Sequence, residues 1–117
     1  MNDLEVESSF YSSVIGLVET HRVTGGEGDG TYAESVMRSP DSDGPSLLLI
    51  KHLHREAPTP GEAVLGFSVA DVDELVRAAQ AAGGTVRGEP RSIPRYRMRT
   101  AQVTDPEGHL LEFVQHL

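Results

Sequence analysis

The sequence predicts an α+β fold made of two copies of one unit of helix and strands. Two segments carry apolar residues at helical spacing, and each begins just after an aspartate. The residues expected to begin and end the two helices are separated by the same distance in sequence. Asp3 and Asp71 are 68 residues apart, and so are Gly16 and Gly84. A period of this length indicates a repeated supersecondary unit and not a solenoid.

The first predicted helix follows Asp3, whose carboxylate can cap free amides of the first turn. Gly16 ends it, because glycine readily adopts the left-handed conformation of a C-terminal stop. Between them, apolar residues step by four, four and three positions, which places them on one helix face. The residues of this predicted face are Val6, Phe10, Val14 and Leu17.

Three strands are predicted after this helix: Leu17–Val23, Tyr32–Met37 and Leu47–Leu53. The loops between them, 25–30 and 39–45, are rich in Gly, Ser, Pro and Asp. The first loop is no phosphate cradle, because it lacks a Lys-Ser/Thr pair and carries two carboxylates that would repel phosphate.

The second unit repeats this order with one more strand, Val64–Ala70, ahead of its helix. Asp71 and Glu74 form an Asp-x-x-Glu box, which can satisfy amides at the start of the helix. The helix stops at Gly83-Gly84. A loop at 90–94 follows the first of the remaining strands, which are Thr85–Glu89, Met98–Thr104 and Leu110–His116.

We therefore expect a single domain over 1–117, with unit 1 at about 1–57, a linker at 58–61 and unit 2 at about 62–117. The first unit has no counterpart to the strand Val64–Ala70. The chain starts at Met1, where that missing strand would end.

Composition excludes several function classes. The 117 residues include no cysteine, which excludes a disulfide framework, a thiol nucleophile and a thiolate zinc site. The net charge of −8 disfavours binding to nucleic acid or to an anionic membrane, since both need a cationic surface. No apolar run approaches the roughly 18 residues of a membrane span. The acidic N-terminus is unlike a secretory signal, so we expect a cytoplasmic protein.

The repeated unit and its closing motif, 105-DPEGHLLEF-113, resemble the vicinal oxygen chelate superfamily of glyoxalase I, bleomycin-resistance proteins and extradiol dioxygenases. Further matching motifs are 10-FY-11 with 14-VIGL-17, 66-GFSVADVD-73 and 98-MRTA-101. The resemblance implies two βαβββ-type units, here without the first strand of unit 1, whose cupped mixed sheets form a cleft.

Metal enzymes of this family place one ligand on the first and the last strand of each unit. Glu112 matches the position on the last strand of unit 2. The equivalent position in unit 1 is Leu48, and Val64 stands where a His is expected. One carboxylate cannot hold a catalytic divalent ion, which usually needs three protein ligands. The resemblance therefore argues for the fold and against a metal cofactor, and we assign no metal ligand and no cofactor.

Strand alternation sorts side chains between the helix and the cleft. Leu111 and Phe113 are expected on the helix side, which turns Glu112 inward. Apolar residues form the expected floor, a lining that suits a partly apolar small molecule. The predicted ligand-binding residues are Tyr32, Glu34, Leu48, Ile50, His52, Val64, Ser68, Tyr96, Thr100 and Gln102.

Glu112 is the candidate catalytic residue. A carboxylate among aliphatic side chains is partly desolvated, which suits it to act as general acid or base. Alternatively, Glu112 pairs with Arg38 or a hydroxyl and only supports the structure.

Two other clusters carry weaker signals. His52 and His54 lie on one strand face as a half-site for zinc or nickel, but His52 lies about 13 Å beyond Leu48, too far to share an ion with Glu112. Four arginines flank Tyr96 in the loop before the strand at 98–104 and could steer an anionic ligand; alternatively they are solvated or contact a partner chain. They are Arg91, Arg95, Arg97 and Arg99.

The favoured hypothesis is a glyoxalase/bleomycin-resistance-like protein with a degenerate metal site. It would sequester a partly apolar ligand or act on it through Glu112. The alternatives are a metal-dependent lyase, epimerase or dioxygenase with Glu112 as one ligand, and a regulatory module with a vestigial cleft. Open sheet edges favour a homodimer, and no nucleic-acid or membrane partner is expected.

Overall fold

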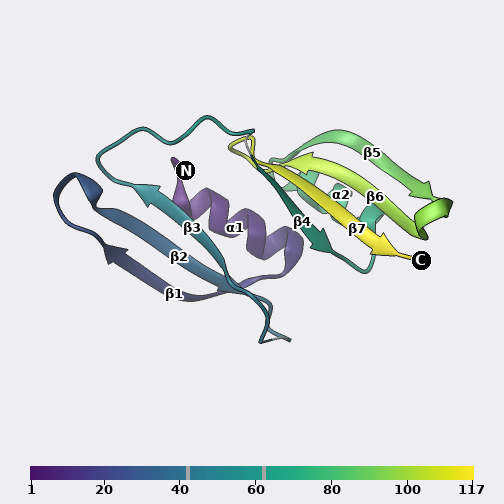
Figure 1. Ribbon diagram of the computed structural model, residues 1–117, viewed down its shortest axis with the longest axis horizontal. Coiled ribbons are helices and arrows are strands. Elements are labelled where there is room, and N and C mark those ends of the chain that lie inside the picture. Colours follow the sequence, from purple (N-terminus) through teal and green to yellow (C-terminus); the bar gives the residue numbers. More distant parts are fainter. Residues whose placement is uncertain (42, 62) are drawn as a thin grey trace. The chain divides into compact units, whose positions relative to one another are not determined.

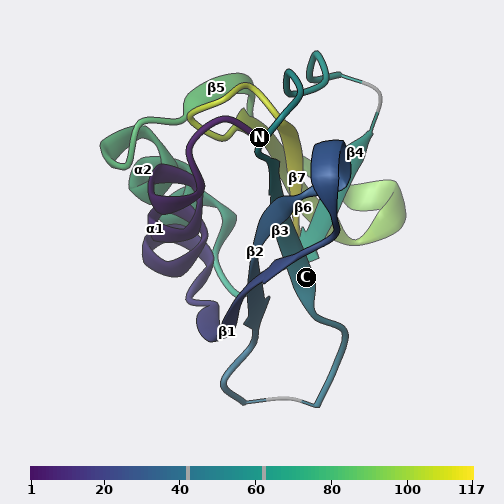
Figure 2. The same ribbon diagram turned by 90° about the vertical axis from the view of Figure 1, so that its left-hand side faces the viewer.

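A computed structural model describes residues 1–41, 43–61 and 63–117 (Figure 1). Ser42, in a predicted loop, and Glu62, at the predicted start of the second unit, lie outside the described residues. The chain divides into unit 1, Met1–Thr59, and unit 2, Pro60–Leu117. Each unit consists of one helix on one face of its own sheet (Figure 2). No described helix is long and apolar enough to cross a membrane.

Unit 1 begins with helix α1, Leu4–Ile15, which is capped as predicted. The carboxylate of Asp3 accepts a hydrogen bond from the amide of Val6 at 3.1 Å, and Gly16 ends the helix at φ 82°. Three strands then form an antiparallel sheet in the order β1-β2-β3. Their bounds are Val18–Gly25, Tyr32–Arg38 and Leu47–His52, and the short 3-10 helix η1 spans Gly28–Gly30.

The buried face of α1 agrees with the predicted one only in part, since Phe10 and Val14 are buried as predicted. Val6 is 46% exposed and Leu17 follows the end of the helix, whereas Leu4 and Tyr11 are buried. The buried positions of the helix are 4, 7, 8, 10, 11 and 14, and the helix packs on β1, β2 and β3. The core of unit 1 comprises Leu4, Phe10, Tyr11, Val14, Met37 and Leu49.

Unit 2 repeats this architecture with one more strand. The amide of Glu74 donates to the Asp71 carboxylate at 3.1 Å, so the predicted cap of α2, Val72–Ala81, is confirmed. The sheet has the order β4-β7-β6-β5, with β4 parallel to β7 and the other pairs antiparallel. The strands are β4 Val64–Ser68, β5 Thr85–Ile93, β6 Met98–Thr104 and β7 Leu110–His116.

The mixed sheet of unit 2 and the three-stranded sheet of unit 1 confirm the predicted α+β repeat. β7 has β4 on one side and β6 on the other, whereas β3 has β2 on one side and no further strand among the described residues. α2 covers one face of its sheet. The core beneath it comprises Val72, Val76, Ala79, Ala101, Val103, Leu111 and Phe113.

Strand β5 is four residues longer than predicted. The segment 90–94, predicted as a loop from its prolines, continues the strand to Ile93, and only then does the 3-10 helix η2, Pro94–Tyr96, follow. Pro90 is tolerated because β5 is an edge strand and its register with β6 shifts between Gly88 and Arg91. The arginines predicted to share one loop are therefore distributed over β5, η2 and β6.

Candidate functional site

One row of residues crosses the sheet of unit 2 on the face opposite α2. Gly66 on β4 pairs with Glu112 on β7, which pairs with Gln102 on β6, which pairs with Gly88 on β5. Their neighbours along β6 and β7 are buried on the helix side, so this row faces away from α2. Glycines at both ends of the row leave the side chains of Gln102 and Glu112 accessible from both sides. At Gly66 a Cβ atom would meet only open space.

Glu112 and Gln102 are joined by a hydrogen bond, with Gln102 Nε2 donating to Glu112 Oε2 at 3.3 Å. Arg38, the alternative partner considered from sequence, instead donates to Ser46 Oγ at 3.1 Å. The second oxygen of Glu112 has no protein donor among the described residues. Glu112 is half-buried, so this oxygen can accept a hydrogen bond or a proton from a bound molecule.

A cavity of about 630 Å³ lies beside the part of this row from Gly88 to Glu112 and is formed by β5, η2, β6 and β7. Its volume falls in the range of small-molecule pockets. The lining is mixed, with apolar side chains at one end and the Glu112–Gln102 pair at the other. The residues around it are Gly88, Glu89, Pro90, Arg91, Ile93, Tyr96, Met98, Thr100, Ala101, Gln102 and Glu112.

A β-bulge in β5 decides which side chain stands beside Thr100. Gly88 pairs with Gln102, but Arg91 and not Pro90 pairs with Thr100, because β5 carries one extra residue between them. Bulges commonly re-aim a side chain in this way. Directly paired residues share a face, so Arg91 points to the cavity side of the sheet.

The arginines around Tyr96 divide among different roles. Arg99 lies on the helix side and donates to both Asp73 oxygens, at 2.7 and 2.8 Å. These hydrogen bonds lower the pKa of the Asp73 carboxyl and raise that of Arg99. Arg95 stacks 4.9 Å from the Tyr96 ring centroid and donates to its hydroxyl. Arg91 is the member of the predicted patch that lines the cavity.

The other predicted residues of unit 2 lie on the same sheet face without lining this cavity. Val64 pairs with Leu110 and Ser68 with Val114, so both belong to the β4 side of the face. Val64 is 52% exposed. Tyr96, Thr100, Gln102 and Glu112 are the predicted residues that the structure brings together around one cavity.

The predicted residues of unit 1 lie on the face of its sheet away from α1. Tyr32 pairs with His52, and their rings meet edge to face with centroids 6.4 Å apart. Glu34 pairs with Ile50 in the next row. Leu48 is half-exposed, and Ser35, Met37 and Leu49 occupy the opposite, buried face.

A polar cluster on the other side of this sheet was not predicted. Arg22 on β1 binds Glu5 of α1 and Glu19, and Ser35 Oγ donates to Glu19 Oε1 at 2.6 Å. The Ser35 hydrogen bond and then Arg22 lower the pKa of the Glu19 carboxyl. A cavity of about 230 Å³ borders these residues. The bulge between Glu19 and His21, which aligns the cluster, has no sequence signal.

The donor set around Glu112 does not fit a catalytic divalent metal ion. Its direct neighbour on β4 is Gly66, the position expected to hold a His is Val64, and the equivalent residue of unit 1 is Leu48. Among the described residues of unit 2, Glu112 belongs to no group of three metal-ligating side chains. A single carboxylate with an amide neighbour falls short of the three protein ligands of such a site.

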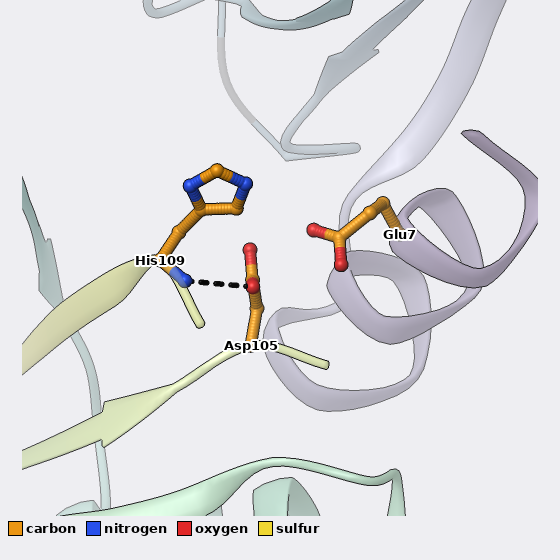
Figure 3. A group of neighbouring side chains, drawn as sticks. All are labelled: Glu7, Asp105 and His109. Atoms are coloured by element: carbon orange, nitrogen blue, oxygen red, sulfur yellow. Dashed lines mark hydrogen bonds between the residues drawn. The ribbon is translucent and has the colours of Figure 1, made fainter. Parts of the chain in front are cut away.

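Asp105, the first residue of the motif 105-DPEGHLLEF-113, has a structural role in the turn before β7. Asp105 Oδ1 accepts hydrogen bonds from the amides of Glu107 and His109, both at 3.0 Å. Figure 3 shows the bond to His109. Asp105 is buried, and this Asx-type turn satisfies its carboxylate and positions the start of β7.

Sequence reasoning missed the part of the cavity wall contributed by β5. Gly88 and Ile93 were assigned no site role, and Arg91 was expected only to steer an anionic ligand from a loop, because Pro90 and Pro94 favoured a loop at 90–94. Met98 was missed for a different reason, since the predicted face of its strand was extended only to Thr100. Alternation from Gln102 back through Thr100 to Met98 is the signal that could have found it.

Comparisons with protein-family models and with solved structures point to the same family. The model of the Glyoxalase/Bleomycin resistance protein/Dioxygenase superfamily matches residues 1–113. A glyoxalase family protein from Bacillus cereus has a similar structure, with a TM-score of 0.81 and 24% identity over 100% of this chain and 89% of that one. A glyoxalase/bleomycin resistance protein from Albidiferax ferrireducens gives 0.72 and 24%, over 100% and 93%.

A mutant glyoxalase I from Zea mays is similar over a smaller share of its own length. Its TM-score is 0.81 with 23% identity, covering 98% of this chain and 43% of the maize chain. The chain thus spans less than half of that enzyme. Likeness at these identities shows the fold alone.

Proposed function

This chain belongs to the glyoxalase/bleomycin resistance protein/dioxygenase superfamily, and we propose that it binds a partly apolar small molecule in the cavity of unit 2. The ligand is sequestered there or is acted on by Glu112. The observation that carries this proposal is the position of Glu112, beside a cavity of about 630 Å³ with one oxygen held by Gln102.

The cavity wall supports binding of a molecule with both apolar and polar parts. Ile93 and Met98 pair across β5 and β6 and present apolar surface. Gln102 and Glu112, two rows away, supply hydrogen-bond partners. Pockets of this kind use apolar contact for affinity and a few polar groups for orientation.

Glu112 can act as a general base without a metal. Gln102 Nε2 donates to Oε2, which restricts the rotation of the carboxylate and leaves Oε1 without a protein donor among the described residues. In this role Oε1 accepts a proton from the bound molecule, which leaves Glu112 neutral and the negative charge on the ligand. The Gln102 amide holds Oε2 throughout, and Glu112 then returns the proton to another atom of the ligand or to water.

Chemical-shift mapping of the ¹⁵N-labelled protein with a panel of neutral aromatic and aliphatic fragments tests the binding site. We expect perturbations at β5, β6 and β7 around the cavity and stabilisation in thermal melts. The proposal would be contradicted if the fragments perturb only other surfaces, or if no fragment binds.

Replacing Glu112 with Gln separates sequestration from catalysis. This variant keeps the shape and the hydrogen bond with Gln102, so fragment affinity should change little, whereas any acid–base reaction should fall about 100-fold or more. Glu56→Gln, an equal charge change at an exposed position of unit 1 after β3, is the control. A stoichiometric metal ion that is lost in Glu112→Gln but retained in Glu56→Gln would favour the metal-dependent alternative.

We also propose that the protein is a homodimer, because sheet edges of both units are open among the described residues. Light scattering should then give twice the 12.6 kDa mass of one chain. A single-chain mass at micromolar concentration would contradict this.

A further inference from the structure

We infer that the ligand of this cavity is a monoanion, a small carboxylate with an apolar substituent, whose charge is bound by Arg91. This inference rests on the proposed function and deepens it. The first observation is the position of Arg91, which the β5 bulge sets directly opposite Thr100 on the cavity side of the sheet.

Arg91 is a cation without a bound carboxylate. Among the described residues no acidic side chain pairs with it, whereas Arg99 on the opposite face is held by Asp73 through two hydrogen bonds. An exposed guanidinium can bind a carboxylate through two parallel hydrogen bonds. Thr100, its direct neighbour, adds a hydroxyl donor to the same place.

The order of the cross-strand residue pairs along β5 and β6 indicates which chemical groups the rest of the ligand carries. Arg91–Thr100 lies between the apolar pair Ile93–Met98 and the pair Gln102–Glu112. Alternate residues along a strand are about 7 Å apart. A ligand with its carboxylate at Arg91 therefore reaches the apolar end with a substituent of a few carbons. A hydrogen-bonding or proton-bearing group on its other side reaches Glu112.

Charge limits the ligand to one negative group. Glu89 and Glu112 also line the cavity, so its acidic side chains outnumber Arg91. A dianion or polyphosphate would be repelled by these carboxylates, whereas a single carboxylate can be matched by the one guanidinium. The cavity thus favours a compact monoanion.

The test uses two probes of nearly equal shape, the anionic 3-phenylpropionate and the neutral 3-phenylpropionamide, with affinity measured by chemical-shift titration. We expect the carboxylate to bind the cavity about tenfold more tightly than the amide. Arg91→Gln should abolish this difference and Arg91→Lys should retain part of it. Arg87→Gln, on the same strand outside the cavity lining, is the matched control and should retain all of it.

Equal binding of both probes to the cavity, or no effect of Arg91→Gln, overturns the inference and leaves the proposed function standing. Inorganic phosphate binding more tightly than 3-phenylpropionate also overturns it. If neither probe perturbs the cavity residues, both the inference and the proposed site fail, so the two failures are distinguishable.

Discussion

The α-amino nitrogen of Met1 donates a hydrogen bond to the carbonyl oxygen of Ile50 at 3.0 Å. In unit 2 the amide of Val69 donates to the carbonyl of Val114 at 2.8 Å. Met1 and Val69 are 68 residues apart, as are the helix caps Asp3 and Asp71. Ile50 and Val114 are 64 residues apart, as are the equivalent strand positions Leu48 and Glu112. The two hydrogen bonds are therefore equivalents, and Met1 occupies the position of the residue that follows β4.

Hydrogen exchange should distinguish β3 from β7. The Ile50 carbonyl points to the open edge of β3, and so do the amides of Ile50 and Leu48, because N–H and C=O of one strand residue point the same way. We expect these amides to exchange about tenfold or more faster than those of Glu112 and Val114, which face β4. Equal protection would show that another strand covers this edge in solution.

Leu48 and Leu49 form a matched pair for testing strand alternation. Leu49 is 2% exposed and packs under α1, whereas Leu48 is 50% exposed. Leu49→Ala should lower the free energy of unfolding by about 2–5 kcal/mol, and Leu48→Ala should change it by about 0.5 kcal/mol or less. Urea denaturation measures both. Similar losses in the two variants would mean that Leu48 is covered, for example by a partner chain.

Asp73→Asn should change how stability depends on pH. The hydrogen bonds from Arg99 lower the pKa of Asp73 in the folded state, relative to about 3.9 in the unfolded chain. The stabilisation is therefore fully present above pH 4 and is lost as pH falls through the folded-state pKa. The variant should be less stable than the parent at pH 7 and should approach it near pH 2.

Denaturation at pH 7, 4 and 2 checks this, with the exposed Asp29→Asn as the control. The effect should be small, because the Asp73 side chain is 40% exposed and solvent screens the pair. A stability difference that stays constant with pH would contradict the assignment to the carboxylate charge.

Substitutions of Gly16 and Gly30 by alanine test whether the left-handed conformation of Gly16 is needed to end α1. Gly16 has φ 82°, in the left-handed region, so Gly16→Ala should cost about 1–2 kcal/mol. Gly30 has no such φ and open space around it, so Gly30→Ala should be neutral or slightly stabilising. Thermal melts of the two variants measure the contrast. Equal melting temperatures would show that α1 does not depend on this stop.

Much of the fold could be predicted from local sequence. Asp3 and Asp71 were recognisable as caps because a capping carboxylate acts within one helical turn. Leu111 and Phe113 were assigned to the helix side because strand alternation has a strict period of two. The repeat also predicted that, among the described residues, no strand lies beside β3 in the place that β4 takes beside β7.

Residues of the site could be predicted from sequence only where the alternation of side chains along one strand was enough to assign them to a face. Thr100, Gln102 and Glu112 were placed on one face by their spacing, but their partners on β4 and β5 depend on strand register. The wrong loop at 90–94 arose because proline is a local signal, and whether it breaks a strand depends on that strand being an edge.

The sequence by itself determined the repeat, the caps, the buried faces of the strands and the family, because these depend on interactions within a few residues or on patterns along the chain. Only the tertiary structure decided that Arg91 faces the cavity while Arg99 binds Asp73, and that glycines flank the Glu112–Gln102 pair. The physical reason is the register between strands far apart in sequence. A single extra residue in β5 changes which side chain stands beside Thr100, and no local preference of the chain encodes that choice.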